Sequence, residues 1–407
     1  MNVKRRALLA SAAAAAALPL RRGRAQGKPG IKIGVLNDQS GTYRDVTGPL
    51  SVACARQAVD ELGDIGFPVE VVVGDHQNKP DIGASIARQW FDRDGVDMIL
   101  DVPTSSVALA VANIAKEKNK AYVNSGGATP DLTGAQCNPQ TVHWTYDTYM
   151  LARSTGGATV KNGGDTWFFI TANYVFGQQL QRDTSRFVTQ GGGKVLGAAI
   201  YPFPETTDFS SFLLQAQSSG AKVVGLANAG GDTVNCVKQA HEFGLTAGGV
   251  KLAALLGSLQ VVDSLTLDVA QGLLITESFY WDLNDRTRAF TKRLEVRTGG
   301  VPCNAVQAGC YGGTIHYLKA VRAIGVDKAR DGAAVIAQMK AMPTDDDAFG
   351  KGRIREDGRN LCPAYLFEVK KPSESKGRWD YYNLIATTSG EDAAPPLADE
   401  HCPMVKS

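Results

Sequence analysis

Six short polar stretches, each directly after an apolar, strand-like run, hold the residues of this sequence that could do chemistry. They combine hydroxyls, backbone N–H groups and aromatic rings with few charges, which suits the binding of one compact ligand. Gly, Ser and Thr are also common in turns and at N-caps, so each single position keeps that second explanation. The stretches are "NDQSGTYRD" (37–45), "PTSS" (103–106), "NSGGATPDLT" (124–133), "ANYVFG" (172–177), "NAGGDT" (228–233) and "GSLQ" (257–260).

The familiar catalytic and cofactor motifs do not occur in the sequence. It has no GxxxxGK phosphate loop, no GxGxxG dinucleotide fingerprint and no GxSxG turn, and "AGCYGG" around Cys310 does not match a cysteine nucleophile. No CxxC, HxxxH or HExxH spacing occurs, and the five histidines are scattered. We therefore expect no cofactor, no metal site and no enzyme activity, although the N–H groups of "NSGGAT" can hold an anion.

Strand-like and helical runs alternate from residue 31 onward. Strands rich in Val and Ile, each followed by a helix, are typical of parallel sheets covered on both faces. The first series is "IKIGVL", a helix near 48–63, "VEVVVGD", a helix from Asp81, "VDMILDV", a helix from Ser105 and "AYVNSG". The second is "TWFFIT" (166–171), a helix after Gly177, "KVLGAAIY", a helix after Asp208, "AKVVGLANA", a helix from Asp232 to Phe243 and "VKLAALL". The predicted fold class is α/β with two doubly wound parallel-sheet lobes.

The last third of the chain has a different pattern. After "GLLITESFYW" (272–281), helical patterns near 287–298, 304–324 and 330–342 have too few strands among them for a third sheet, so they should cover the two lobes. "GRIREDGRNLCPAYLFEV" predicts a hairpin with Asp357-Gly358 at its turn. The Pro-rich stretch 391–407 predicts an irregular C-terminal tail.

The first 25 residues have the pattern of an export signal. A basic start precedes an Ala/Leu run of 14 residues from Ala7 to Leu20, and small residues stand before an expected cleavage near Ala25. This run is shorter than the roughly 20 residues that cross a bilayer, which disfavours an N-terminal anchor. Arg5-Arg6 resembles a twin-arginine signal, although an ordinary secretory signal also begins with basic residues. The expected location is the periplasm.

The net charge changes sign when this segment is removed. It contains six of the 43 Lys and Arg and none of the 41 Asp and Glu, which leaves 37 basic against 41 acidic residues. No basic patch remains that would favour nucleic acid, and no later apolar run is long enough to span a membrane.

Seven cysteines allow disulfides in an exported protein, but their odd number leaves at least one free thiol. Cys303 and Cys310 would lie about 10 Å apart on one helix, too far to bridge. Cys137 and Cys402 stand in loop-like, Pro-flanked surroundings and are the candidate pair.

The mature chain resembles the Leu/Ile/Val-binding family of periplasmic components of ABC transporters, which has the type I periplasmic-binding fold. The likeness rests on the order and spacing of "IKIGVLNDQSG", "SGGATPDLT", "YVFGQ", "TDFSSFLLQAQSSGAKVVGLANAGGD" and "AQGLLITESFYW". It implies two lobes, 26–145 with 279–346 and 146–278 with 347–390, which close on a ligand by a hinge motion. Three crossover segments should fall near 144–148, 276–281 and 345–350. It also implies a membrane permease and its ATPase as partners, and we expect a monomer.

The resemblance places a ligand carboxylate in the first lobe. The matching positions are Ser105 or Ser106 after the third strand and Ala128 and Thr129 after the fourth, and charge-assisted hydrogen bonds from hydroxyls and N–H groups would hold the anion. This stretch is one residue shorter than the usual pattern, so the contacts can shift by one between Gly126 and Thr129. Phe176, Tyr174 and Tyr43 match ligand-contacting aromatic residues, or they pack at the core or lip. The full predicted set is Tyr43, Ser105, Ser106, Gly127, Ala128, Thr129, Tyr174, Phe176, Asn228, Gly230, Asp232 and Ser258.

Two departures from the family pattern bear on the ligand. Ala229 stands where amino-acid binders have an aromatic residue, and Ser258 stands where they have an acidic one. A buried ammonium without a counter-charge costs several kcal/mol, so an α-amino acid would need Asp232, which otherwise serves as the N-cap of its helix. We therefore expect a small, mainly apolar or aromatic carboxylate, with a hydrophobic amino acid or an amide (urea-like) solute second. A ligand-sensing receptor subunit is the other functional class.

Overall fold

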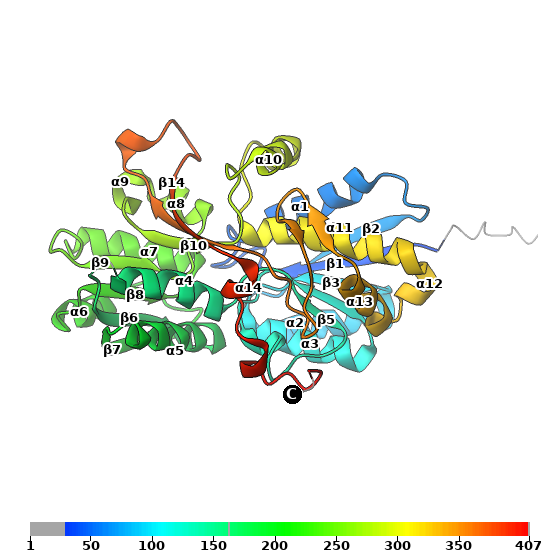
Figure 1. The fold of residues 1–407 in the computed structure, drawn as a ribbon, viewed down its shortest axis with the longest axis horizontal. Coiled ribbons are helices and arrows are strands. Elements are labelled where there is room, and N and C mark those ends of the chain that lie inside the picture. Colours follow the sequence, from blue (N-terminus) through cyan, green and yellow to red (C-terminus); the bar gives the residue numbers. More distant parts are fainter. Residues whose placement is uncertain (1–28, 162, 406–407) are drawn as a thin grey trace, which may run out of the picture.

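The computed structural model describes residues 29–161 and 163–405, so the predicted export signal and its predicted cleavage point lie outside the described residues. Figure 1 shows two lobes side by side, with the chain running between them more than once. We call the unit built on the first sheet the first lobe and the unit built on the second sheet the second lobe.

The first sheet has five parallel strands in the order β2-β1-β3-β4-β5. All residues of β3 and β4 are buried, as expected for a parallel sheet with both faces covered. The strands are β1 (Ile31–Asn37), β2 (Val69–Asp75), β3 (Met98–Asp101), β4 (Ala121–Asn124) and β5 (Thr141–His143). The sequence predicted the first four, and β5 was missed because three residues give no measurable pattern.

Helices from two parts of the chain cover this sheet (Figure 1). The expectation that the late helices cover an existing lobe is confirmed, since α11 packs on α1, β3 and α13, although the residues after them form a small two-stranded sheet. An Asn304–Gln307 capping box starts α11. The covering elements are α1 (Gly48–Leu62), α2 (Pro80–Gln89), η1 (Trp90–Asp94), α3 (Ser105–Lys118), η2 (Pro130–Leu132), α10 (Asp285–Thr298), α11 (Ala305–Ile324), α12 (Val326–Ala329) and α13 (Gly332–Ala341).

The second sheet has seven strands in the order β14-β13-β10-β9-β8-β6-β7. Strands β6 to β10 are parallel, while β13 and β14 join one edge antiparallel. The strands are β6 (Thr166–Ala172), β7 (Lys194–Tyr201), β8 (Val223–Ala227), β9 (Lys251–Ala254), β10 (Leu274–Glu277), β13 (Ala364–Val369) and β14 (Tyr382–Thr388). The helices are α4 (Thr148–Lys161), α5 (Val175–Gln190), α6 (Ser210–Ser218), α7 (Gly230–Glu242), α8 (Leu259–Leu265) and α9 (Leu267–Ala270). The predicted α/β class with two doubly wound lobes is confirmed.

Three segments carry the chain between the lobes before β14, and the C-terminal tail then returns from β14 to the first lobe. The first joins β5 to α4, the second joins β10 to α10, and the third runs through β11 (Thr344–Asp346) and β12 (Gly350–Gly352) to β13. The first and third are bonded to each other, because His143 donates its N–H to Gly358 at 2.9 Å and Asn360 donates to His143 at 2.9 Å. A fully buried ion pair between Arg359 and Asp147 joins the same two segments.

The prediction of a hairpin at 352–369 is correct for its turn and wrong for its second strand. The turn exists, since Gly358 donates to the carbonyl of Arg355 at 2.9 Å and Ile354 bridges Asn360. However, β13 pairs with β10 and β14 instead of folding back on the preceding residues. Its apolar residues are buried in the second sheet, which a local turn signal does not reveal.

The C-terminal tail is fixed to the first lobe by a covalent bond. Cys137 and Cys402 form a disulfide with their Cα atoms 5.6 Å apart, and the remaining five cysteines are free and buried. The short elements of this region are η3 (Pro372–Glu374), α14 (Gly390–Ala393) and η4 (Leu397–Asp399).

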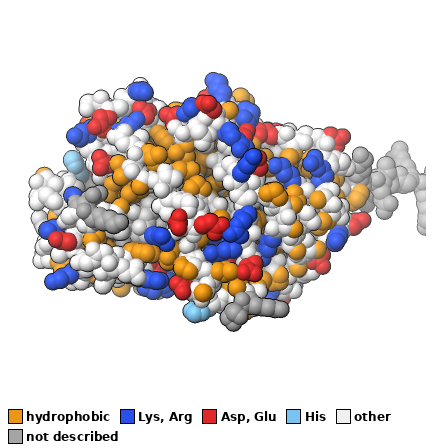
Figure 2. Space-filling model, in the orientation of Figure 1, with side chains coloured by type: hydrophobic (Ala, Val, Ile, Leu, Met, Phe, Trp, Pro, Cys, Tyr) orange, Lys and Arg blue, Asp and Glu red, His pale blue; other side chains and the backbone are white. Residues whose placement is uncertain are grey.

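The surface carries charges of both signs. Figure 2 shows acidic and basic side chains interspersed over the face that it presents, with smaller groups of hydrophobic side chains between them. No helix in the described ranges combines the length and the apolar composition that a membrane crossing requires.

Candidate ligand-binding site

A cavity lies between the two lobes, at the carboxyl ends of their parallel strands. Its free volume is only about 20 Å³, so the side chains that line it nearly fill the space between the lobes. Both lobes contribute, and the lining side chains are mostly apolar or aromatic. They are Tyr43, Val46, Thr47, Pro103, Gly126, Ala128, Tyr146, Tyr174, Phe176, Ala229, Leu256 and Val306.

Near the first-lobe wall lies a buried serine, Ser105, which does not itself line the cavity. Ser105 is the first residue of α3, is fully buried, and its Oγ makes no hydrogen bond within the described residues. Pro103, two residues earlier, lines the cavity, as does Ala128. A buried hydroxyl without a partner is costly, and a helix start favours an anion, so this corner suits a carboxylate.

Three other first-lobe positions predicted from the sequence have partners of their own or lie off the cavity. The N–H of Gly127 donates to Oδ1 of Asn124 at 3.0 Å, and its carbonyl accepts from Nδ2 of Asn124 at 2.7 Å. The hydroxyl of Thr129 accepts from the N–H of Asp131 at the start of η2. Ser106, the second residue of α3, does not line the cavity.

Aromatic rings from both lobes close the cavity. The hydroxyls of Tyr43 and Tyr174 lie 2.6 Å apart and join the first lobe to the second. Phe203 stacks on Tyr174 at 4.3 Å and on Tyr43 at 5.4 Å between ring centroids. Phe176, the second residue of α5, is buried and lines the cavity. Burial raises the pKa of Tyr43 well above its usual value, so its hydroxyl keeps its proton.

The polar residues at two second-lobe strand ends serve their own helices. Asn228 accepts from the hydroxyl of Thr233 at 2.8 Å and donates to Cys236 at 3.4 Å, both within α7. Ser258 is the N-cap of α8, and its Oγ accepts from the N–H of Val261. Neither residue lines the cavity.

Asp232 is a buried carboxylate with donors from both lobes. Oδ1 accepts from the hydroxyl of Thr42 in the first lobe at 3.0 Å, and Oδ2 accepts from the hydroxyl of Tyr201 at 2.7 Å. Asp232 is the third residue of α7, whose N-cap is Ala229, so the alternative that it is the N-cap is wrong. Burial raises the pKa of Asp232 to about 6, although both hydroxyls act against the rise.

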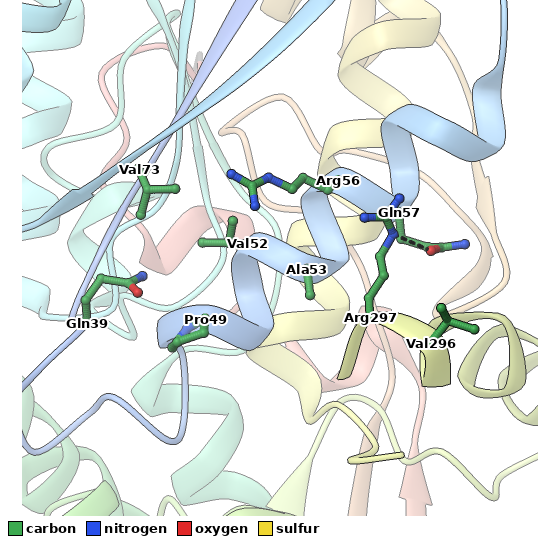
Figure 3. Close-up of a pocket in the computed structure, with 9 residues that line it drawn as sticks. All are labelled: Gln39, Pro49, Val52, Ala53, Arg56, Gln57, Val73, Val296 and Arg297. Atoms are coloured by element: carbon green, nitrogen blue, oxygen red, sulfur yellow. Dashed lines mark hydrogen bonds between the residues drawn. The ribbon is translucent and has the colours of Figure 1, made fainter. Parts of the chain in front are cut away.

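A larger groove lies on the outside of the first lobe, away from the cleft. Figure 3 shows its lining side chains, which come from α1, from Val73 of β2, from Val296 and Arg297 of α10, and from Gln39. Every lining residue belongs to the first lobe, so hinged closure cannot enclose a ligand there. The smaller cavity between the lobes is therefore the candidate site.

Comparison with known proteins agrees with this geometry. The family model "periplasmic binding protein" matches residues 30–378. This chain belongs to the periplasmic binding protein family.

Two solved structures share much of the sequence of this binding protein. A periplasmic binding protein from Burkholderia mallei is 46% identical, with 93% of this chain and 99% of that chain covered and a TM-score of 0.89. A branched chain amino acid ABC transporter periplasmic ligand-binding protein from Burkholderia xenovorans is 39% identical, with 92% and 99% covered and a TM-score of 0.80.

A third structure shows the same fold at lower identity. The solute binding protein of an ABC transporter from R. palustris, in complex with benzoate, is 21% identical, with 90% and 97% covered and a TM-score of 0.79. The search of curated proteins gives no match.

Sequence reasoning missed several lining residues of this binding protein. Tyr146 lies in the first passage between the lobes, and Val306 lies at the start of α11, where no strand end marks them. Leu256 lies beside a loop that was singled out, but its apolar side chain gave no functional signal, and Ala229 was noted only as a departure from the family pattern. Thr47 is the N-cap of α1, just beyond the first polar stretch.

The described part of this binding protein has no cluster of three or more His, Cys, Asp or Glu side chains arranged to hold a metal ion. The carboxyls of Asp101, Asp232 and Glu277 are each buried among other protein groups. Burial raises the pKa of Asp101 to about 6 and that of Glu277 to about 8, so Glu277 carries a proton at neutral pH.

Proposed function

We propose that this protein captures a small, mainly apolar or aromatic carboxylate between its lobes, as the solute-binding component of an ABC uptake transporter. The observation that carries the proposal is the mostly apolar and aromatic lining of the cavity, together with the unpaired, buried hydroxyl of Ser105 two residues after the lining residue Pro103. One anionic group would accept hydrogen bonds at this corner, and the flat remainder of the ligand would lie against Phe176 and Tyr174.

The lack of a free acidic group argues against an α-amino acid. No Asp or Glu lines the cavity, and both oxygens of Asp232 already accept hydrogen bonds from protein hydroxyls. An ammonium group enclosed there would be buried without a counter-charge, at a cost of several kcal/mol. A hydrophobic amino acid is therefore the second choice, and a neutral amide the third.

Structural relatives support an aromatic ligand by analogy. Solute-binding proteins of R. palustris are described in complex with benzoate and with 4-hydroxybenzoate, at 21% and 24% identity. The Burkholderia xenovorans relative, at 39% identity, is described as part of a branched chain amino acid transporter. A hydrophobic amino acid is therefore one of the ligands to be tested.

The proposed cycle takes place outside the cytoplasm and needs no chemical step. The monomeric protein binds its ligand in the periplasm, closes, and presents the closed form to a membrane permease with its ATPase. An ABC transporter role, rather than that of a sensor, is the role given for relatives of similar length.

Calorimetric titration of refolded, ligand-stripped protein tests the ligand class. Benzoate and phenylpropenoid acids should bind with a negative heat-capacity change, because an apolar ring is buried. Benzamide, which has the shape of benzoate without its charge, is the matched control and should bind more weakly by about 1.5–3 kcal/mol. Tight binding of leucine with no response to the acids would refute the proposal.

A further inference from the structure

The tip of the first long loop inserts into the start of α7 across the cleft. The carbonyl of Thr42 accepts from the N–H of Gly231 at 2.9 Å, and its hydroxyl donates to Asp232 at 3.0 Å. One first-lobe residue therefore makes two hydrogen bonds to consecutive residues of the second lobe.

Two glycines make this approach possible. A Cβ atom on Gly230 would lie 2.4 Å from the carbonyl oxygen of Thr42, and one on Gly231 would lie 2.8 Å from its hydroxyl. Gly230 also has φ +58, which disfavours other residues. Any side chain at these positions would push the loop away from α7.

The contact lies outside the proposed ligand cavity. Thr42, Gly231 and Asp232 do not line it, whereas the neighbours Tyr43 and Ala229 do. Asp232 is held from its own lobe by Tyr201, which is fully buried. Asp232 therefore has one partner within its own lobe, and Thr42 adds a second bond that comes from the opposite lobe.

The geometry points to a latch: Thr42 and the Gly230–Asp232 turn hold the lobes closed over a bound ligand, and so set how slowly the ligand leaves. This inference rests on the proposed function, because it needs a ligand that is released by opening. A contact present only in the closed form adds to affinity through the closed population, without touching the ligand.

The variants Thr42→Val and Gly231→Ala test the latch. Valine keeps the shape of threonine without its hydroxyl, and alanine at a helical position favours folding while its Cβ crowds the Thr42 hydroxyl. We expect the dissociation rate measured by stopped flow to rise about tenfold in each variant, with an association rate within about twofold of wild type.

Gly157→Ala is the matched control. Gly157 lies in α4 of the same lobe, and a Cβ there meets nothing within 4 Å. This variant also gains helix propensity and should leave both rates unchanged. Unchanged dissociation in both latch variants, with wild-type melting temperatures, would overturn the latch.

Small-angle scattering separates this inference from the proposed function. If wild type binds none of the offered acids, the proposed function fails, but ligand-free protein still reports on closure. The latch then predicts a larger radius of gyration for Thr42→Val and Gly231→Ala than for wild type and Gly157→Ala. Equal radii for all four proteins would overturn it.

Discussion

A serine stands at the matching position on each side of the cleft, but the hydroxyl groups of the two serines have different hydrogen bonds. Ser105 and Ser258 each follow a strand, stand two residues after a cavity-lining residue, and are buried at the start of a helix. The hydroxyl of Ser105 has no partner among the described residues, whereas that of Ser258 caps α8. Near the first-lobe wall a buried hydroxyl is thus left without a protein partner, whereas the matching hydroxyl of the second lobe is used within its own helix.

This contrast extends to the whole of each wall. In the second lobe Asn228 and Asp232 are hydrogen-bonded to protein groups, and what lines the cavity is Tyr174, Phe176, Ala229 and Leu256. Under the proposed function, the first lobe would hold the charged group of the ligand and the second lobe would contact its apolar part.

Exchanging the two serines for alanine gives the largest expected effect. Ser105→Ala should weaken binding of an anionic ligand by about 2 kcal/mol, roughly thirtyfold, with little change in melting temperature because no protein hydrogen bond is lost. Ser258→Ala should cost about 1 kcal/mol of folding stability through loss of the cap and leave affinity nearly unchanged. Calorimetric titration and thermal melts check both. A similar response of the two variants would abolish the contrast between the walls.

The pH dependence of ligand binding tests whether Asp232 takes up a proton when the lobes close. Burial raises its pKa to about 6 in this structure, where Thr42 of the opposite lobe contacts it, so we expect closure to take up a proton as the pH falls below 6. The ionised form is the one that burial disfavours, so its cost is full above pH 6 and decreases as the pH falls. We expect affinity to be higher at pH 5 than at pH 7, by at most about tenfold.

The control for this experiment is Asp232→Asn, which has no proton to take up and should show equal affinity at both pH values. The titratable groups that face Asp232 are Tyr43, Tyr174, Tyr201 and Cys236, whose pKa values are all raised, so none of them ionises in this range. The same pH response in wild type and variant would show that another group is responsible.

The smallest expected effect concerns the hydroxyl pair between the walls. Tyr174→Phe removes the bond to Tyr43 and should weaken binding by about 0.5–1.5 kcal/mol, with ring stacking on Phe203 retained. Tyr280→Phe is the control, because that hydroxyl donates to the carbonyl of Trp379 within the second lobe. It should reduce folding stability alone. If both variants lost affinity equally, the hydroxyl pair would have no special part in closure.

The alternation of strands and helices was predictable from sequence, because Val- and Ile-rich runs with intervening helices leave a strong pattern. Helix α4 was missed because its sequence is rich in Thr and Gly, and β14 because Leu384 and Ile385 are exposed and break the alternation of a half-buried strand. Both elements are fixed by packing against β13 rather than by their own composition.

Site residues were less predictable than the fold, for a physical reason. Ser, Asn and Asp after a strand serve equally well as helix caps or as ligand contacts, and only the three-dimensional surroundings decide. The sequence therefore located the loops around the cavity. It did not show that the side chains of Asn228, Ser258 and Asp232 make hydrogen bonds to protein groups. Tyr146 and Val306 come from segments that pass between the lobes, which strand-end reasoning does not examine.

The Cys137–Cys402 disulfide closes a ring that contains the whole second lobe, because one cysteine precedes that lobe in sequence and the other follows it. A protease that nicks the exposed turn near Thr246–Gly249 would cut this ring once without separating the pieces. The nicked molecule should run as one band on a denaturing gel without reductant and as two bands with it. The disulfide therefore keeps the two fragments covalently joined after a single cleavage by a protease.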